Sequence, residues 1–147
     1  MDQAPKARPG KGATVDLSTT PPRELSVVIP ACNEEACIER TLYELDEFLP
    51  PRFADFELIV VDDGSTDGTA SVVEKWRGRT GRRARLLRND RNQGKGHAVR
   101  RGALESNGEV VILLDADLPY ELATIEDFMA SLQHGADLAI GSRVLPG

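Results

Sequence analysis

Short apolar runs alternate with stretches of helical periodicity along the chain from Leu25 onward. The runs are rich in β-branched residues and apolar on both faces, which predicts buried strands at residues 25–30, 56–61, 84–87, 110–114 and 138–140. Between them, apolar residues recur at helical spacing, which predicts helices ending before Pro50, starting after Asp67, and covering residues 94–104 and 121–132. This alternation indicates an α/β fold, a mostly parallel sheet with helices on both faces.

The polar residues that flank these runs suggest where two helices begin. Asn33 is predicted to cap the first helix and Asp67 the second, because asparagine and aspartate side chains accept hydrogen bonds from the first N–H groups of a helix. Residues 1–23 carry several prolines and glycines and few large apolar side chains, which predicts a disordered leader. Residues 24–147 are expected to form one domain.

Composition narrows the class of protein. The chain has 147 residues and a formal net charge of −6, which argues against a general nucleic-acid-binding protein. Its longest apolar run, residues 110–114, is far too short to span a membrane. Cys32 and Cys37 lack the spacing and partners of a zinc site and are predicted to be free thiols.

Acidic residues follow three of the predicted strands: Glu34 and Glu35 after the first, Asp62 and Asp63 after the second, and Asp115 and Asp117 after the fourth. Because ligands bind beyond the carboxyl ends of parallel strands, these residues are expected to converge on one site. Asp115 and Asp117 suit Mg²⁺ or Mn²⁺, which accept one or two carboxylates and complete their shells with phosphate and water. An alternative role for Asp117 is to cap the next helix. The pair Asp62 and Asp63 is equally typical of a simple turn.

A glycine-rich turn precedes the predicted helix at residues 94–104. Gly94, Lys95 and Gly96 favour an anion site, in which backbone N–H groups and the lysine face a phosphate. The turn lacks the spacing of a P-loop, so this signal is weak alone. His97 and His134 have no partners at metal-ligand spacing and are expected to be structural or exposed.

Five motifs in order resemble those of family 2 glycosyltransferases of the GT-A fold: SVVIPACNEE (26–35), VVDDGSTDGT (60–69), NQGKGHAVR (92–100), DAD (115–117) and GSR (141–143). The sequence is most similar to polyprenyl-phosphate (dolichyl-phosphate) glucosyl- and mannosyltransferases, from about Leu25 to the end. The resemblance implies a Rossmann-like nucleotide-sugar-binding domain.

The resemblance also implies residue roles. The nucleotide-binding set would be Pro30, Cys32, Glu34, Asp62, Lys95, Asp115 and Ala116. The catalytic pair would be Asp117 and Arg143, with Arg143 and Lys95 neutralising phosphate. Asp117 would hold Mg²⁺ or Mn²⁺, together with Asp115 directly or through water.

The implied activity is that of an inverting hexosyltransferase. A hexose would pass from a nucleotide-sugar donor, UDP-glucose or GDP-mannose, to a lipid-phosphate acceptor such as polyprenyl phosphate, or to a glycan, in cell-envelope glycan biosynthesis. The expected location is cytoplasmic, with peripheral contact at the inner face of the membrane. Two residues depart from the family pattern: Cys32 replaces a usual aromatic residue, and Pro119 replaces a metal-binding glutamine of mannosyl enzymes, which favours the glucosyl branch.

Two alternatives stay open. The sequence stops at Gly147, soon after the GSR motif, so a C-terminally truncated fragment that binds nucleotide-sugar without turnover is a second interpretation. A phospho-receiver domain is a remote third, because the acidic ends of residues 58–63 and 112–115 resemble its phospho-acceptor site.

Overall fold

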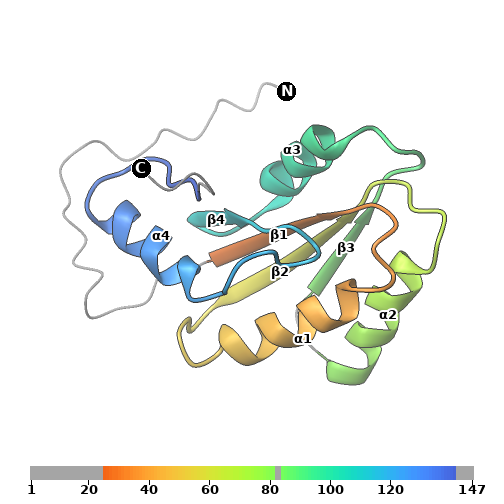
Figure 1. Ribbon diagram of the computed structural model, residues 1–147, viewed down its shortest axis with the longest axis horizontal. Helices are drawn as coiled ribbons and strands as arrows, with labels where there is room; N and C mark the ends of the chain where they lie inside the picture. The colour runs from red at the N-terminus through yellow and green to blue at the C-terminus, as the bar shows by residue number, and fades with distance from the viewer. Residues whose placement is uncertain (1–24, 82–83, 142–147) are drawn as a thin grey trace, which may run out of the picture.

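A parallel sheet forms the centre of the protein. The computed structural model describes residues 25–81 and 84–141. The strands of its four-stranded sheet are β1 (Leu25–Ala31), β2 (Phe56–Asp62), β3 (Ala84–Arg88) and β4 (Val110–Leu113). They lie in the order β3-β2-β1-β4, and every pairing is parallel. The four corresponding strands are confirmed, with ends that differ by at most one residue (Figure 1). The predicted burial is wrong for one face of β4, where the side chains of Val111 and Leu113 are 39% and 48% exposed.

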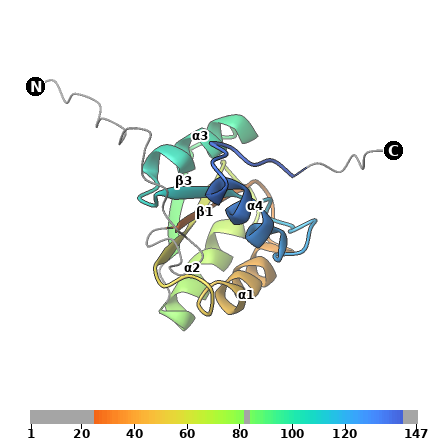
Figure 2. The same ribbon diagram turned by 90° about the vertical axis from the view of Figure 1, so that its left-hand side faces the viewer.

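Helices cover both faces of this sheet, as the alternating pattern predicts. They are α1 (Ile38–Phe48), α2 (Thr69–Thr80), α3 (Lys95–Glu105) and α4 (Thr124–Gln133). Figure 2 shows α3 on one side of the sheet and α1 and α2 on the other. The larger core lies between β1, α1 and α2 and includes Ile125 and Met129 of α4. A smaller core joins Val28 and Ala98 beneath α3.

The strand order places a switch point between β1 and β4. From β1 the chain adds β2 and then β3 on one side, after which α3 returns it to β4 on the other side of β1 (Figure 1). Connections leaving β1 and β4 therefore diverge at the carboxyl ends of these strands. In an open parallel sheet, this divergence is where ligands bind.

The predicted strand at residues 138–140 is wrong. These residues are irregular, and the side chains of Leu138 and Ile140 are 73% and 77% exposed. Apolar, β-branched residues form a strand only when a neighbouring strand completes the ladder. No described strand pairs with this segment, so its local preference is not realised.

The predicted cap of the first helix is also wrong. Helix α1 begins only at Ile38, and no side chain caps it. Asn33 instead has a left-handed backbone (φ 58°), and its Oδ1 accepts a hydrogen bond from Thr66 N at 2.9 Å. Asp67 does bind the start of α2, since its Oδ1 accepts from Thr69 N at 2.9 Å.

Some expectations fall on residues outside the described ranges. The predicted leader at residues 1–23 and Arg143 both lie there. Among the described helices, none is long and apolar enough to cross a bilayer. Helix α4 starts at Thr124, three residues later than its apolar pattern suggests.

Candidate functional site

The loop that follows β4 carries the predicted acidic pair and is anchored on α1. Asp115 is half-buried, Ala116 is buried and Asp117 is exposed. The backbone oxygen of Ala116 accepts a 2.6 Å hydrogen bond from the hydroxyl of Thr41 on α1. Leu118 then takes a left-handed conformation (φ 45°), which turns the chain away from the sheet. The loop is therefore held at its centre, with a carboxylate on either side.

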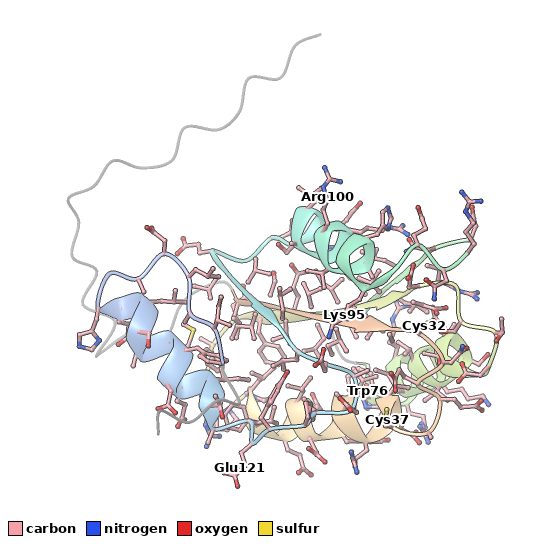
Figure 3. All side chains as sticks on the ribbon, turned by 45° about the horizontal axis from the view of Figure 1, so that its top comes forward. Cys32, Cys37, Trp76, Lys95, Arg100 and Glu121 are labelled. Carbon is pink, nitrogen blue, oxygen red and sulfur yellow. The ribbon has the colours of Figure 1, made fainter. Side chains whose placement is uncertain are left out.

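Lys95, the first residue of α3, reaches across to this loop (Figure 3). Its ammonium group forms an ion pair with Oδ1 of Asp115, and the hydroxyl of Tyr120 donates to Oδ2 of the same carboxylate at 3.2 Å. The hydrogen bond to Asp115 raises the pKa of Lys95, and the charges of Asp115 and Asp117 add to this effect. The structure therefore brings Lys95 to the loop after β4, which lies 20 positions further along the chain.

The loop after β1 contributes Glu34 to the same neighbourhood. The thiol of Cys37 donates to Glu34 Oε2 at 3.0 Å. Burial raises the pKa of Cys37 to about 11, with further increases from the hydrogen bond to Glu34 and from the charges of Glu34 and Asp117. Glu34 and Asp117 thus both lie within electrostatic reach of one thiol. Cys37 is a neutral thiol at pH 7.

Hydrogen bonds fasten the loop after β1 to the loop after β2. Glu34 N donates to the hydroxyl of Thr69 at 2.9 Å. Gly68 N donates to Glu35 Oε2, also at 2.9 Å, while Glu35 N donates to Asp67. These reciprocal bonds fix the backbone around Glu34. They link residues more than 30 positions apart, so no local sequence signal indicates them.

Pro30 and Cys32, the other predicted pocket residues of this loop, are half-buried. Pro30 lies in β1, and Cys32 follows it. Asn92 Nδ2 lies 3.2 Å from the sulfur of Cys32 and donates a hydrogen bond to it. Both cysteines are free thiols, as predicted.

Asp62 and Asp63 have different surroundings. Asp62 is fully buried, with Oδ1 accepting from Ser65 N at 2.9 Å and Oδ2 bound by Arg88 Nε at 3.2 Å. The contact with Ser65 is the turn interaction that the sequence also allowed. A contact between Asp62 and a base stays a prediction.

Asp63 supports the candidate site, although the sequence analysis assigned it no role there. It is 3% exposed, and its carboxylate accepts hydrogen bonds from Asn89 Nδ2 (2.6 Å), Gln93 N (3.0 Å) and Gly94 N (2.8 Å). Burial alone would raise the pKa of Asp63, but these three bonds outweigh it and hold the pKa below its usual range. Asp63 therefore holds the turn from which Lys95 projects.

This arrangement removes the N–H of Gly94 from the predicted anion cradle in the glycine-rich turn, and a phosphate site at this turn stays a prediction. Gly94 has a positive φ of 95°, which suits glycine, and α3 starts at the next residue. The N–H groups of Gln93 and Gly94 bind the Asp63 carboxylate, so they are not free donors for a phosphate. What the turn presents at the carboxyl edge is the Lys95 side chain.

The carboxylates fit a small, hard cation. Asp115 and Asp117 offer oxygen ligands on one loop, and Mg²⁺ or Mn²⁺ is commonly held by one or two carboxylates with phosphate oxygens and water. Within the described residues, no group of three or more metal-binding side chains occurs. Any metal here would take its remaining ligands from the bound substrate and from water.

A parallel α/β sheet with a lysine and a carboxylate pair at its switch point is the architecture of a nucleotide-binding domain. Residues 26–147 match the family model for glycosyl transferase family 2, and the chain belongs to that family. This membership excludes the phospho-receiver alternative.

Curated relatives narrow the resemblance within the family. The chain is 38% identical over 117 residues to a dolichyl-phosphate β-glucosyltransferase of Mus musculus, covering 76% of this chain and 36% of the relative. It is 32% identical over 124 residues to a dolichol-phosphate mannosyltransferase of Pyrococcus furiosus, covering 84% and 34%. The chain thus spans about a third of the length of these relatives.

The fold of this chain is similar to that of a solved glycosyltransferase structure. A mannosyltransferase from Pyrobaculum calidifontis, in complex with GDP-Man and Mn²⁺, superposes with a TM-score of 0.60 at 33% identity. The match covers 67% of this chain and 28% of that one. The GT-A fold expected from the motifs is confirmed.

Proposed function

We propose that this chain forms the donor-binding part of an inverting glycosyltransferase that takes a hexose from UDP-glucose or GDP-mannose. The observation that carries this proposal is the cluster at the switch point, where Lys95 and Asp115 form an ion pair beside Asp117. A diphosphate needs both a metal bridge and a cation, and these side chains supply sites for both. Similarity to the dolichyl-phosphate enzymes supports a sugar nucleotide as the donor.

Asp115 and Asp117 would hold Mg²⁺ or Mn²⁺, a Lewis acid that stabilises the departing diphosphate. Lys95 would leave Asp115 and neutralise phosphate oxygens, as would Arg143, which lies outside the described residues. The backbone around Ala116 and Glu34 is fixed by Thr41 and Thr69, so the nucleotide would meet a preorganised surface.

The acceptor we propose is a lipid phosphate such as polyprenyl phosphate. The curated relatives are named for dolichyl-phosphate and dolichol-phosphate, which are lipid phosphates. A phosphate acceptor is already an anion, so its attack on the sugar requires no strong general base. We place the reaction on the cytoplasmic side, with the protein in peripheral contact with the membrane.

Calorimetric titration tests donor binding. UDP and GDP are titrated separately into the chain with Mn²⁺ or Mg²⁺, and again in EDTA. We expect one nucleotide to bind with metal and to lose at least about tenfold in affinity without it, because the cation that would neutralise the diphosphate is removed. Equal affinity in EDTA would contradict the metal-binding role.

Asp117→Asn is the matched variant for this titration. It removes one hard oxygen ligand at an exposed position, so metal-dependent binding should fall while the circular dichroism spectrum stays unchanged. Asp90→Asn, the same chemical change at another exposed residue, should bind as the unmodified chain does. The helix-capping alternative for Asp117 is wrong, because α4 begins at Thr124 and no side chain caps it. If Asp117→Asn unfolds the protein, Asp117 has a structural role in its loop instead of a metal-binding one.

A second candidate function is nucleotide-sugar binding without transfer. The chain spans about a third of the length of its relatives, and catalysis also needs an acceptor held in line with the anomeric carbon. A radiolabelled transfer assay with polyprenyl phosphate and each donor separates the two candidates. Binding without turnover supports the second, and turnover by the 147-residue chain supports the first.

A further inference from the structure

Positive charge is concentrated in one segment of this acidic chain. Residues 88–101 contain five cationic side chains, Arg88, Arg91, Lys95, Arg100 and Arg101, and a single acid, Asp90. The whole chain nevertheless has a net charge of −6. This segment comprises the loop after β3 and the first two turns of α3. The basic charge therefore gathers on the side of the sheet that α3 covers.

The outer side of α3 faces away from the sheet. Ala98 is fully buried, and a Cβ built on Gly102 would lie 2.3 Å from a methyl group of Val28 in β1, so these two residues define the inner side. At 100° per residue, Arg100 and Leu104 lie on the opposite side. Figure 3 shows the Arg100 side chain pointing outward. Of the described helices, α3 alone covers this face.

The arginines on this outer side are not neutralised by described acids. Arg100 has no hydrogen bond or ion pair with any described residue. Arg101 donates 2.6 Å hydrogen bonds to the backbone oxygen of Arg88 and to Asn89 Oδ1, both neutral acceptors. Glu105, the acid at the end of α3, is bound by Arg85 Nη2 at 3.1 Å. Arg85 is shared between Glu105 and Glu57, whereas Arg100 and Arg101 have no acidic partner among the described residues.

A hollow and an exposed leucine complete this surface. The hollow has a volume of about 330 Å³ and is lined by Asn89, Gln93, His97, Arg100, Arg101, Leu104 and one acid, Glu105, which is paired with Arg85. Leu104 is 68% exposed, although leucine is the most apolar residue of the outer side. Arginines beside an exposed leucine are the pattern by which a helix rests on an anionic bilayer, with charges at the headgroups and an apolar side chain below them.

We propose that the outer surface of α3, defined by His97, Arg100, Arg101 and Leu104, docks on an anionic lipid bilayer. The hollow takes a headgroup phosphate between the two arginines, and Leu104 enters the acyl boundary. Lys95 begins the same helix at the switch point. Docking would therefore hold the carboxyl edge of the sheet beside the membrane. The proposal concerns binding alone and stands whether or not the chain transfers sugar.

Vesicle flotation of the 147-residue chain tests this surface. The vesicles are phosphatidylcholine alone or phosphatidylcholine containing phosphatidylglycerol, at low and at physiological salt. We expect binding only with phosphatidylglycerol, weakened by salt. Arg100→Gln should lower the partition constant about fivefold, the effect of about one elementary charge near such a surface. Leu104→Ser should lower it further at every salt concentration.

Lys75→Gln is the matched control. Lys75 is an exposed residue of α2, on the other side of the sheet, and its replacement changes the net charge equally. Binding that survives Lys75→Gln but falls in Arg100→Gln supports the surface, provided that circular dichroism shows both variants folded. Equal loss in both would show a net-charge effect and overturn the proposal, as would no vesicle binding. Tighter binding to an RNA oligonucleotide, lost in Arg100→Gln, would assign the surface to nucleic acid instead.

Discussion

Replacing Asp63 with asparagine removes a buried charge that three neighbouring groups bind. The donors are Asn89 Nδ2, Gln93 N and Gly94 N, at 2.6, 3.0 and 2.8 Å. An asparagine keeps one acceptor oxygen but places an NH₂ group against a backbone N–H, so one bond is lost and two donors face each other. Hydrogen bonds to a buried charge contribute more than neutral ones, and an unsatisfied buried donor costs about 1–3 kcal/mol.

The expected loss is about 3 kcal/mol of unfolding free energy at neutral pH, from one charge-assisted bond and one unsatisfied donor. This is a large part of the typical stability of a small domain, about 5–15 kcal/mol, yet it leaves the fold intact. Urea denaturation measures the loss through the fluorescence of Trp76, which is the single tryptophan and is fully buried. Asp90→Asn, an exposed aspartate in the adjacent loop, should change nothing.

The pH dependence gives an independent check with a definite sign. The pKa of Asp63 is lower in the folded protein than its usual value, so its stabilisation is fully present above the unfolded pKa, about 3.9. The stabilisation is lost as the pH falls through the folded value. The difference between the unmodified chain and Asp63→Asn should thus be constant from pH 7 to about pH 5 and shrink in more acidic buffer. A loss below about 1 kcal/mol at pH 7, or a difference that persists unchanged in strong acid, would refute the reasoning.

Two further outcomes follow from the packing of α3 and from the thiol on α1. Gly102→Ala should destabilise the protein by about 1–3 kcal/mol because its Cβ would clash with Val28. Gly78→Ala in α2, where the added Cβ has open space, should be neutral or stabilising. Urea denaturation measures both variants, and an undiminished stability of Gly102→Ala would disprove the clash. Cys37, whose pKa is raised to about 11, should react with iodoacetamide at pH 8 at least about tenfold more slowly in the folded protein than in the urea-unfolded chain. Glu34→Gln should increase the reaction rate of Cys37 in the folded protein. Peptide mass spectrometry follows the rate, and equal rates in folded and unfolded chains would contradict the raised pKa.

The sheet could be predicted from the sequence because its strands are short and apolar on both faces. Residues such as Val27 and Val28 point to opposite faces of β1, and both are fully buried, since helices cover both faces. A strand that is buried on both faces is a continuous apolar run, and such a run can be recognised in the sequence. The segment containing Leu138 and Ile140 is also apolar, but no described strand pairs with it. Whether an apolar segment becomes a strand depends on a neighbouring strand that pairs with it, and local composition does not reveal that strand.

The candidate site was predictable only in its acidic part. Asp115 and Asp117 stand out because they directly follow the most apolar run of the sequence, residues 110–114. The role of Asp63 depends on Asn89, Gln93 and Gly94, about 30 residues away, and the turn signal of Asp-Gly conceals it. The predicted helix cap at Asn33 failed for a related reason. Asparagine suits both a helix cap and a left-handed turn, and the hydrogen bond from Thr66 N to Asn33 stabilises the turn.

Helix α3 carries residues of both proposed sites, the donor site at the switch point and the membrane-docking surface on its outer side. Its inner side is fitted closely to β1 at Gly102, its first residue is Lys95, and its start is held by Asp63. A helix fixed at both points moves little relative to the sheet. The backbone positions of Lys95 at the carboxyl edge and Arg100 on the outer side therefore keep a constant separation. If both proposals hold, a donor at the switch point and a lipid phosphate at the bilayer are brought together by the placement of this helix, without any hinge within it.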